Sequence, residues 1–260
     1  RRLMGQENNL YPNGYRWDKM RLSLKHMVST REEAMVIADY MEKKFRDPRV
    51  KKSFVDMSTF TEMEATLGAD IFRQYSCLGC HQIKDDEGKL IGGPISTTLF
   101  NAGNRYTLDW WSRFAENPQD FTPHSGEYLA DISLRKARHI IGYVMTLGKK
   151  DFKFYEPWKS KEFKDADVER GAKVYMEYCA QCHGKEGKGD GPGAKGLDPK
   201  PAVHADLPLS DYPDDYLYNL VYYGGKSVGK SPNMPDWGMT LPEQSLADVI
   251  TYLRSTFKNL

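Results

Sequence analysis

All four cysteines of the 260-residue chain fall in two pentapeptides of the form Cys-x-x-Cys-His. The first is Cys77-Leu-Gly-Cys-His81 and the second is Cys179-Ala-Gln-Cys-His183. No cysteine remains for a disulfide. The chain must therefore fold so that two thiols and an imidazole are presented together at two places.

This pattern is typical of covalent attachment of a c-type haem. Two thiols three positions apart can each form a thioether with one haem vinyl group, and the histidine after the second thiol is placed to bind the iron as proximal ligand. We therefore predict two covalently bound haem c groups. The predicted attachment residues are Cys77, Cys80, His81, Cys179, Cys182 and His183.

Two other interpretations of the cysteines fit less well. A zinc site built from both pairs leaves the two histidines unexplained, and the pairs lie about 100 residues apart, where zinc ribbons place them roughly 15–20 apart. A thioredoxin-like redox pair needs a βαβ setting, and the flanking segments have helical spacing.

The surroundings of the two motifs repeat. Residues 68–77 match residues 171–179 with one extra residue before the first cysteine, and both segments predict an amphipathic helix that leads into the motif. The later predicted helices also occur in pairs, at 108–115 and 214–223 and at 134–147 and 244–257. A repeat of this length indicates a duplicated domain, because solenoid units are roughly 20–50 residues long.

At these motifs the chain resembles the class I cytochrome c family in a tandem di-haem arrangement, over residues 63–260. The resemblance implies an all-α fold around each haem, electron transfer as the activity, and maturation outside the cytoplasm. We expect an N-terminal helical extension (1–62), a first cytochrome c domain (63–150), a linker (151–163) and a second cytochrome c domain (164–260).

The resemblance also implies a hydrogen bond from each proximal histidine to the carbonyl of a later proline. Pro94 is the expected acceptor in the first copy and Pro201 in the second, with Pro199 as the alternative. Such a bond fixes the imidazole orientation and raises its basicity.

The distal ligands are predicted to differ. Residues 231–237 resemble the Met-Pro loop of the family, so Met234 is the expected ligand of the second haem, with Met239 as its rival. No methionine occurs between His81 and Tyr143 in the first copy, and His124 lies beside the matching position. We predict His81/His124 ligation there. The alternatives are a five-coordinate iron, or His26 or Met27 from the extension.

Three remaining features fit structural roles. His139 lies inside a predicted helix, and His204 follows His183 too soon to replace Met234. In the extension, Thr30 to Glu33 resembles a capping box, and the helix after it should end before Pro48.

Six-coordinate haems predict an electron-transfer protein with no activity of its own, acting as a carrier or as a subunit of a respiratory or nitrogen-cycle oxidoreductase complex. Thioether ligation gives the second haem the higher potential. A di-haem peroxidase and an assembly subunit are the alternatives. Five lysines near the second motif suit an acidic redox partner: Lys185, Lys188, Lys195, Lys226 and Lys230.

The net charge, the length of the apolar stretches and the start of the sequence limit the classes of function and the location that we expect. The net charge of +1 gives no support for nucleic-acid binding, and the longest apolar stretch, 139–147, is about half of a membrane span. The sequence opens at Arg1 without an initiator Met or an apolar leader, so we expect a processed product or a fragment. Together with haem attachment, this predicts an extracytoplasmic protein, in the bacterial periplasm or an equivalent compartment.

Overall fold

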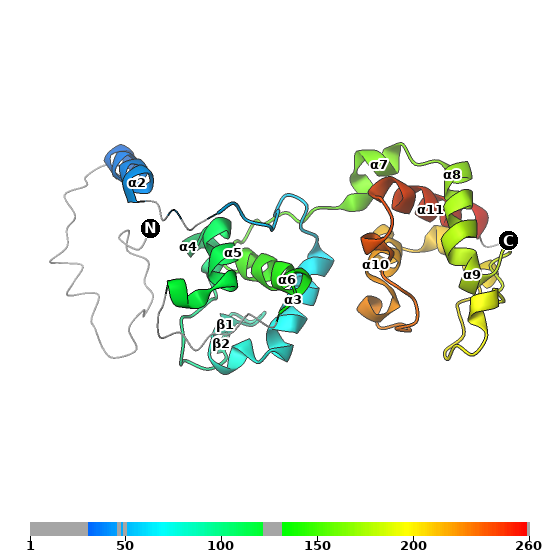
Figure 1. Ribbon diagram of the computed structural model, residues 1–260, viewed down its shortest axis with the longest axis horizontal. Coiled ribbons are helices and arrows are strands. Elements are labelled where there is room, and N and C mark those ends of the chain that lie inside the picture. The colour runs from blue at the N-terminus through cyan, green and yellow to red at the C-terminus, as the bar shows by residue number, and fades with distance from the viewer. Residues whose placement is uncertain (1–30, 46–47, 49–50, 122–131, 259–260) are drawn as a thin grey trace. The chain divides into compact units, whose positions relative to one another are not determined.

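The computed structural model describes residues 31–45, 48, 51–121 and 132–258 (Figure 1). The chain divides into two compact units, residues 1–154 and residues 155–260. This division falls inside the predicted linker. The second half of that linker packs with the second unit, because Trp158 and Phe163 both contact Tyr218.

The first unit is mostly helical. In the part of this unit that carries the motif, the two longest helices, α3 and α6, lie against each other (Figure 1). A capping box fixes the start of α3, because Thr61 accepts from the backbone N–H of Glu64 and the Glu64 carboxylate accepts from the Thr61 backbone. The elements in order are α2 (Arg31–Phe45), α3 (Glu62–Gln74), β1 (Ile83–Lys84), β2 (Leu90–Ile91), α4 (Ala102–Arg105), α5 (Leu108–Glu116) and α6 (Leu134–Thr146), with 3-10 turns at Cys77–Gly79 and Pro118–Asp120.

A glycine allows α3 and α6 to approach closely. A Cβ at Gly68 would collide with the carbonyl oxygen of His139 and would lie 2.7 Å from the Cβ of Tyr143. One turn further along α3, Phe72 meets the Tyr143 ring edge-on at 5.8 Å. The crossing therefore brings the two helix backbones into contact and places the rings of Phe72 and Tyr143 edge to face beside it.

The packed part of this unit begins earlier than residue 63. Phe60 is fully buried, and its ring occupies the space that a side chain at Gly142 would need. Val55 is also in the core, and the Ser53 backbone donates to Asp109 at 2.7 Å. The predicted extension boundary at residue 62 is therefore too late, because the apolar residues Val55 and Phe60, which precede α3, complete the core.

Two short strands qualify the all-α prediction. β1 and β2 pair antiparallel, with Ile83 opposite Ile91 and Lys84 opposite Leu90. The turn between them is closed by Asp85, whose carboxylate accepts from the backbone N–H of Glu87 and of Lys89. This hairpin directly follows His81.

The second unit repeats the helix crossing. Here α8 and α11 pack together, and a Cβ at Gly171 would collide with the carbonyl oxygen of Asp248 and lie 2.7 Å from the Cβ of Tyr252. Tyr175 then meets Tyr252 at 5.2 Å. The unit contains α7 (Lys161–Lys164), α8 (Val168–Val174), a π-helical turn (Tyr175–Cys179), α9 (Ala180–His183), α10 (Asp214–Tyr223) and α11 (Glu243–Thr256), with 3-10 turns at Pro157–Lys159, Pro192–Ala194, His204–Asp206, Leu209–Asp211, Gly225–Val228 and Trp237–Met239.

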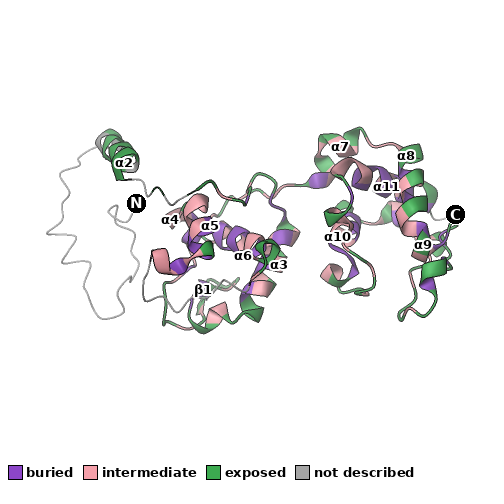
Figure 2. Cartoon of the chain, in the orientation of Figure 1, coloured by how far each residue is buried: buried purple, intermediate pink, exposed green. Residues whose placement is uncertain are grey.

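Burial follows the crossings. Buried residues concentrate on α6 and α11, whereas the described side chains of α2 are exposed (Figure 2). α2 ends at Phe45, before Pro48 as predicted, and Thr30 of the predicted capping box lies outside the described residues. Within the described part of the chain, none of the helices combines the length and the apolar character that a membrane span requires.

Candidate haem-binding sites

The second motif lies on a nearly continuous helical segment. α8 runs through the π-helical turn into α9, so that Cys179 ends one element and His183 ends the next. Burial raises the pKa of the Cys179 thiol to about 12, and the neighbouring Cys182 adds to the shift. None of the four cysteines forms a disulfide in the structure, so each motif has two thiols that can form thioethers.

The His183 imidazole is held from the loop that follows the motif. Its Nδ1 lies 3.0 Å from the carbonyl oxygen of Ala202. A carbonyl can only accept, so Nδ1 carries the hydrogen and Nε2 is left with its lone pair for a metal. The expected acceptor, Pro201, is wrong by one residue, because the loop turns so that the next carbonyl faces the ring.

His204 contacts His183 directly. The two rings stack with centroids 4.0 Å apart and planes inclined by 17°. Burial lowers the pKa of His204 to about 3, and the neighbouring His183 contributes to that shift. His204, for which a structural role is expected, therefore packs directly on the motif histidine His183.

Met234 lies in a loop anchored at the end of α10. The Gly225 N–H donates to the Met234 carbonyl at 3.1 Å, and a Cβ at Gly224 would lie 2.8 Å from that same oxygen. The Met234 side chain is half-buried and packs against the core of the unit. Its rival Met239 is 67 % exposed, and this arrangement favours Met234 as the ligand.

The first motif begins differently. α3 ends at Gln74, and Ser76 adopts the left-handed conformation with φ 56° before the 3-10 turn Cys77–Gly79. The turn is closed by the His81 N–H, which donates to the Cys77 carbonyl at 2.9 Å. His81 itself is buried.

The His81 imidazole is held in the same manner as His183. Its Nδ1 lies 2.7 Å from the carbonyl oxygen of Thr97, which leaves Nε2 with its lone pair. The acceptor expected at Pro94 is thus corrected to Thr97, because the loop runs three residues further before a carbonyl reaches the ring. Sequence reasoning missed both acceptors, since any residue offers a carbonyl and the side chains carry no signal.

Glycines press the following loop against each motif. In the first unit, side chains at Gly92 and Gly93 would collide with the carbonyls of His81 and Gly79. In the second unit, a side chain at Gly191 would collide with the carbonyls of Ala180 and Gln181. Both motifs are therefore closed in by a tightly apposed loop that leaves no room for a Cβ.

One buried polar atom of the first unit fits a bound cofactor. Trp111 is 7 % exposed, and its indole Nε1–H has no acceptor among the described residues. A buried donor without a partner is costly, and a carboxylate such as a haem propionate would satisfy it. Together with the two thiols of each motif and the Nε2 lone pairs of the two histidines, this donor fits a haem. The predicted distal ligand His124, and the alternatives His26 and Met27, lie outside the described residues.

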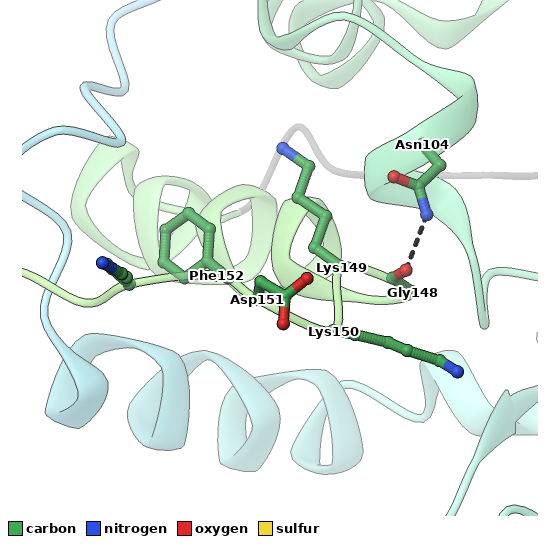
Figure 3. Close-up of a pocket in the computed structure, with 7 residues that line it drawn as sticks. Asn104, Gly148, Lys149, Lys150, Asp151 and Phe152 are labelled. Atoms are coloured by element: carbon green, nitrogen blue, oxygen red, sulfur yellow. Dashed lines mark hydrogen bonds between the residues drawn. The ribbon is translucent and has the colours of Figure 1, made fainter.

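A separate pocket lies at the end of α6, where Asn104 donates to the Gly148 carbonyl at 2.6 Å (Figure 3). Its remaining lining is residues 149–153, which include three lysines but none of the motif residues. Among the residues that the structure describes, no group of three or more His, Cys, Asp or Glu side chains is arranged to hold a metal ion by itself.

Comparison with known proteins agrees with the geometry. Residues 166–253 match the family described as cytochrome c oxidase, cbb3-type, subunit III. The chain is 29 % identical over 207 residues to the gluconate 2-dehydrogenase cytochrome c subunit of Pantoea cypripedii, which covers 70 % of this chain and 45 % of that protein. It is 33 % identical over 94 residues to the cytochrome c subunit of alcohol dehydrogenase (quinone) of Gluconobacter oxydans (strain 621H), covering 34 % of this chain and 18 % of that protein.

The chain thus spans less than half the length of these two relatives. The match over residues 166–253 supports a cytochrome c domain there, and such a domain implies covalently bound haem c. The chain is homologous to cytochrome c subunits of dehydrogenases, which supports electron transfer and does not favour the peroxidase-like alternative.

Proposed function

We propose that the chain is a di-haem c-type cytochrome that transfers electrons as a subunit of an oxidoreductase complex of the dehydrogenase type. The observation that carries the proposal is the shared geometry of the two motifs. In each unit the histidine directs Nδ1 to a backbone carbonyl, Thr97 or Ala202, and keeps Nε2 for a metal. Two separate units with this arrangement support two haems and not one.

The chain's own residues would hold each haem at three points. Cys77 and Cys80, or Cys179 and Cys182, would form the thioethers, and the histidine that follows would bind the iron. When bound, a haem supplies reversible one-electron chemistry. The carbonyl behind each imidazole keeps the ring oriented and makes it a stronger donor.

The two distal sides are proposed to differ. Met234 completes the second site, where its loop is fixed on Gly224 and Gly225. His124 is proposed for the first site. A soft thioether favours ferrous iron over ferric iron more than an imidazole does, so electrons would enter at the first haem and leave from the second.

The partner would be an acidic redox protein or an acidic face of another subunit. The five lysines around the second motif and the Met234 loop are all exposed, although Lys188 is paired with Glu186. Such a set steers an oppositely charged partner, and the electron-transfer rate should then fall as salt is added. The relatives are cytochrome c subunits of dehydrogenases, which supports this setting. An extracytoplasmic location is proposed from the two haem-attachment motifs.

The test is the intact mass of the denatured protein, because thioether-bound haem survives denaturation. The expected mass exceeds that of the polypeptide by two haem groups. Replacing both Cys179 and Cys182 with alanine should remove one group, and the same change at Cys77 and Cys80 should remove the other. A protein with one haem that is lost only with the second pair would overturn the di-haem proposal, and the mass of the bare polypeptide would overturn both attachments.

A further inference from the structure

We propose that His204 is a positioning residue that sets the plane of the His183 imidazole by stacking on it. The inference deepens the proposed function, since it concerns the proximal ligand of the second haem. A metal-bound imidazole can rotate about its single bond to the metal. The hydrogen bond from Nδ1 of His183 to the Ala202 carbonyl limits that rotation, and a parallel ring at 4.0 Å limits it further.

His204 can do this because it is itself fixed. The Tyr175 hydroxyl lies 3.1 Å from the carbonyl oxygen of Gly184 and 3.2 Å from Nδ1 of His204. The carbonyl can only accept, so the assignment that satisfies both contacts has the hydroxyl donating to Gly184 and the His204 Nδ1–H donating to the hydroxyl oxygen. Tyr175 is fully buried, so this anchor does not move with the surface.

The far side of the His204 ring is also enclosed. Phe257 meets it edge-on at 5.5 Å, and Phe257 in turn packs against Tyr175 at 5.8 Å. A side chain at Gly187 would lie 2.6 Å from the Phe257 ring and 3.0 Å from the His204 Cβ, so this position has room only for glycine. The Ala205 N–H donates to the Gly187 carbonyl at 3.1 Å and closes the turn.

The same short segment therefore supplies both contacts on the proximal ring. Ala202 gives the hydrogen-bond acceptor and His204, two residues later, gives the stacked plane. The acceptor sets how strong a donor the imidazole is, and the stacked ring sets which way it faces. A residue that filled space alone would be replaceable by any apolar side chain of similar size, whereas this role requires a flat ring.

The experiment compares variants of the full chain with its haems attached. His204→Phe keeps a flat ring, His204→Leu removes it, and Ala205→Ser is the control in the same turn. The readouts are the low-temperature electron paramagnetic resonance g values and the paramagnetically shifted haem-methyl proton resonances of the oxidised protein. The first haem serves as an internal reference. We expect His204→Leu to change the pattern of the second haem most. His204→Phe keeps the flat ring but loses the hydrogen bond to Tyr175, so it should change the pattern less, and the control should leave it close to the wild type.

A second variant keeps the inference testable if His204→Leu does not accumulate. Tyr175→Phe removes only the hydroxyl that anchors His204, so it should shift the same signals in the same direction by a smaller amount. Unchanged signals in His204→Leu, with two haems per chain, would overturn the inference. Equal changes in the phenylalanine and leucine variants would also overturn it, by showing a volume effect. Wild-type protein that lacks haem at Cys179 and Cys182 would instead overturn the proposed function.

Discussion

Both units contain the same kind of contact between two helix backbones, but the ion pair beside that contact has its charges exchanged between the helices. Gly68 lets α3 touch α6 in the first unit and Gly171 lets α8 touch α11 in the second, and a tyrosine follows the touched carbonyl by four residues in both. The ion pair beside this contact is reversed. In the first unit the acid, Glu64, is on α3 and Arg138 is on α6. In the second unit Arg170 is on α8 and the acid, Asp248, is on α11.

This difference separates what the fold requires from what it tolerates. The glycine cannot be replaced without moving two backbones, because the atoms it faces are carbonyl groups. The ion pair needs only complementary partners on the two helices, so its direction can be exchanged. The contact between the two helix backbones is therefore required for the fold, whereas the ion pair changes only the stability of the unit.

The units also differ where the helix enters the motif. The first unit has one more residue between its glycine and its first cysteine, and there the helix stops and Ser76 turns left-handed. In the second unit the chain remains helical through a π turn. Both routes end with the motif histidine hydrogen-bonded through Nδ1 to a backbone carbonyl, so this contact is shared although the backbone path to it differs.

The largest effect is expected from a substitution that gives the second haem the bis-histidine ligation proposed for the first. Met234→His exchanges a thioether for an imidazole, which stabilises ferric iron. The potential of the second haem should fall by a sizeable part of the roughly 0.8 V range that axial ligation controls. A redox titration measures this step, with intact mass as the check that both haems remain. The control is Met239→His, which alters an exposed residue, and a fall in potential in that variant instead would make Met239 the ligand.

The helices in this comparison were predictable from the sequence, whereas the contacts between them were not. Apolar spacing predicted helices near 134–147, 214–223 and 244–257, and the structure has α6 at Leu134–Thr146, α10 at Asp214–Tyr223 and α11 at Glu243–Thr256. Local periodicity is sufficient for this because each helix buries one face. It says nothing of Phe60, which reaches the core from outside any helix.

The candidate sites divide in the same way. The proposed attachment residues could be predicted from the motif alone, since their chemistry depends on adjacent positions, and the intact mass tests them. The carbonyls of Thr97 and Ala202 and the ring of His204 act through loops whose course depends on tertiary contacts. The glycines that press these loops onto the motifs were visible in the sequence, but glycine alone does not say which carbonyl it lets approach.

The next largest effect tests the shared contact. Gly68→Ala and Gly171→Ala each place a Cβ against a backbone carbonyl, so each should destabilise its own unit by about 3 kcal/mol, at the upper end of overpacking costs. Hydrogen exchange followed by mass spectrometry on peptides from α6 and α11 reports the units separately. Asp70→Ala and Lys173→Ala, two residues further along the same helices and exposed, are the matched controls and should change little. Equal effects from the glycine variants and their controls would contradict the close contact.

The reversed ion pairs should contribute unequally. Asp248 accepts from the backbone of Asp167, twice from Arg170 and once from Gln244, so Asp248→Asn places an amide against donors and should cost about 2 kcal/mol. Glu64→Gln keeps the capping box and should cost about half as much.

Urea unfolding, followed by probes of each unit, gives the two values. The exposed pair of Asp70 and Arg73 is the reference, and Asp70→Asn should cost less than about 0.5 kcal/mol. A larger loss from Glu64→Gln than from Asp248→Asn would show that the first unit depends more on its ion pair.

The last prediction concerns acid and the buried histidine at the helix crossing of the first unit. Burial lowers the pKa of His139 from 6.5 to about 4, and Arg135 and Arg138 on the same helix add to this. The Glu64 carboxylate faces the ring from α3, with Oε1 at 3.8 Å from Nε2, but it is already paired with Arg138. The folded unit therefore keeps His139 neutral where the unfolded chain protonates it.

The lowered pKa of His139 determines the pH range over which the first unit loses stability. Its stability from His139 is complete above about pH 6.5 and is lost as the pH falls towards 4, by about 1–2 kcal/mol at pH 5. Burial raises the pKa of Asp248, but the hydrogen bonds from Arg170, Asp167 and Gln244 outweigh it and lower the pKa overall. The loss that Asp248 contributes in the second unit therefore begins only near and below the ordinary carboxyl pKa of 3.8. Burial lowers the pKa of His204 to about 3, so the second unit also loses stability below about pH 6.5, through that histidine.

Between pH 7 and pH 5, exchange in α6 should accelerate, after correction for the intrinsic pH dependence of amide exchange. His139→Gln should remove this acceleration and leave the response of α11 unchanged, because glutamine does not titrate and His204 belongs to the other unit. An acceleration in α6 that persists in His139→Gln, or a response of α11 that disappears in that variant, would contradict the assignment. Each unit therefore has its own source of acid sensitivity, which is His139 at the helix crossing in the first unit and His204 in the loop after the motif in the second.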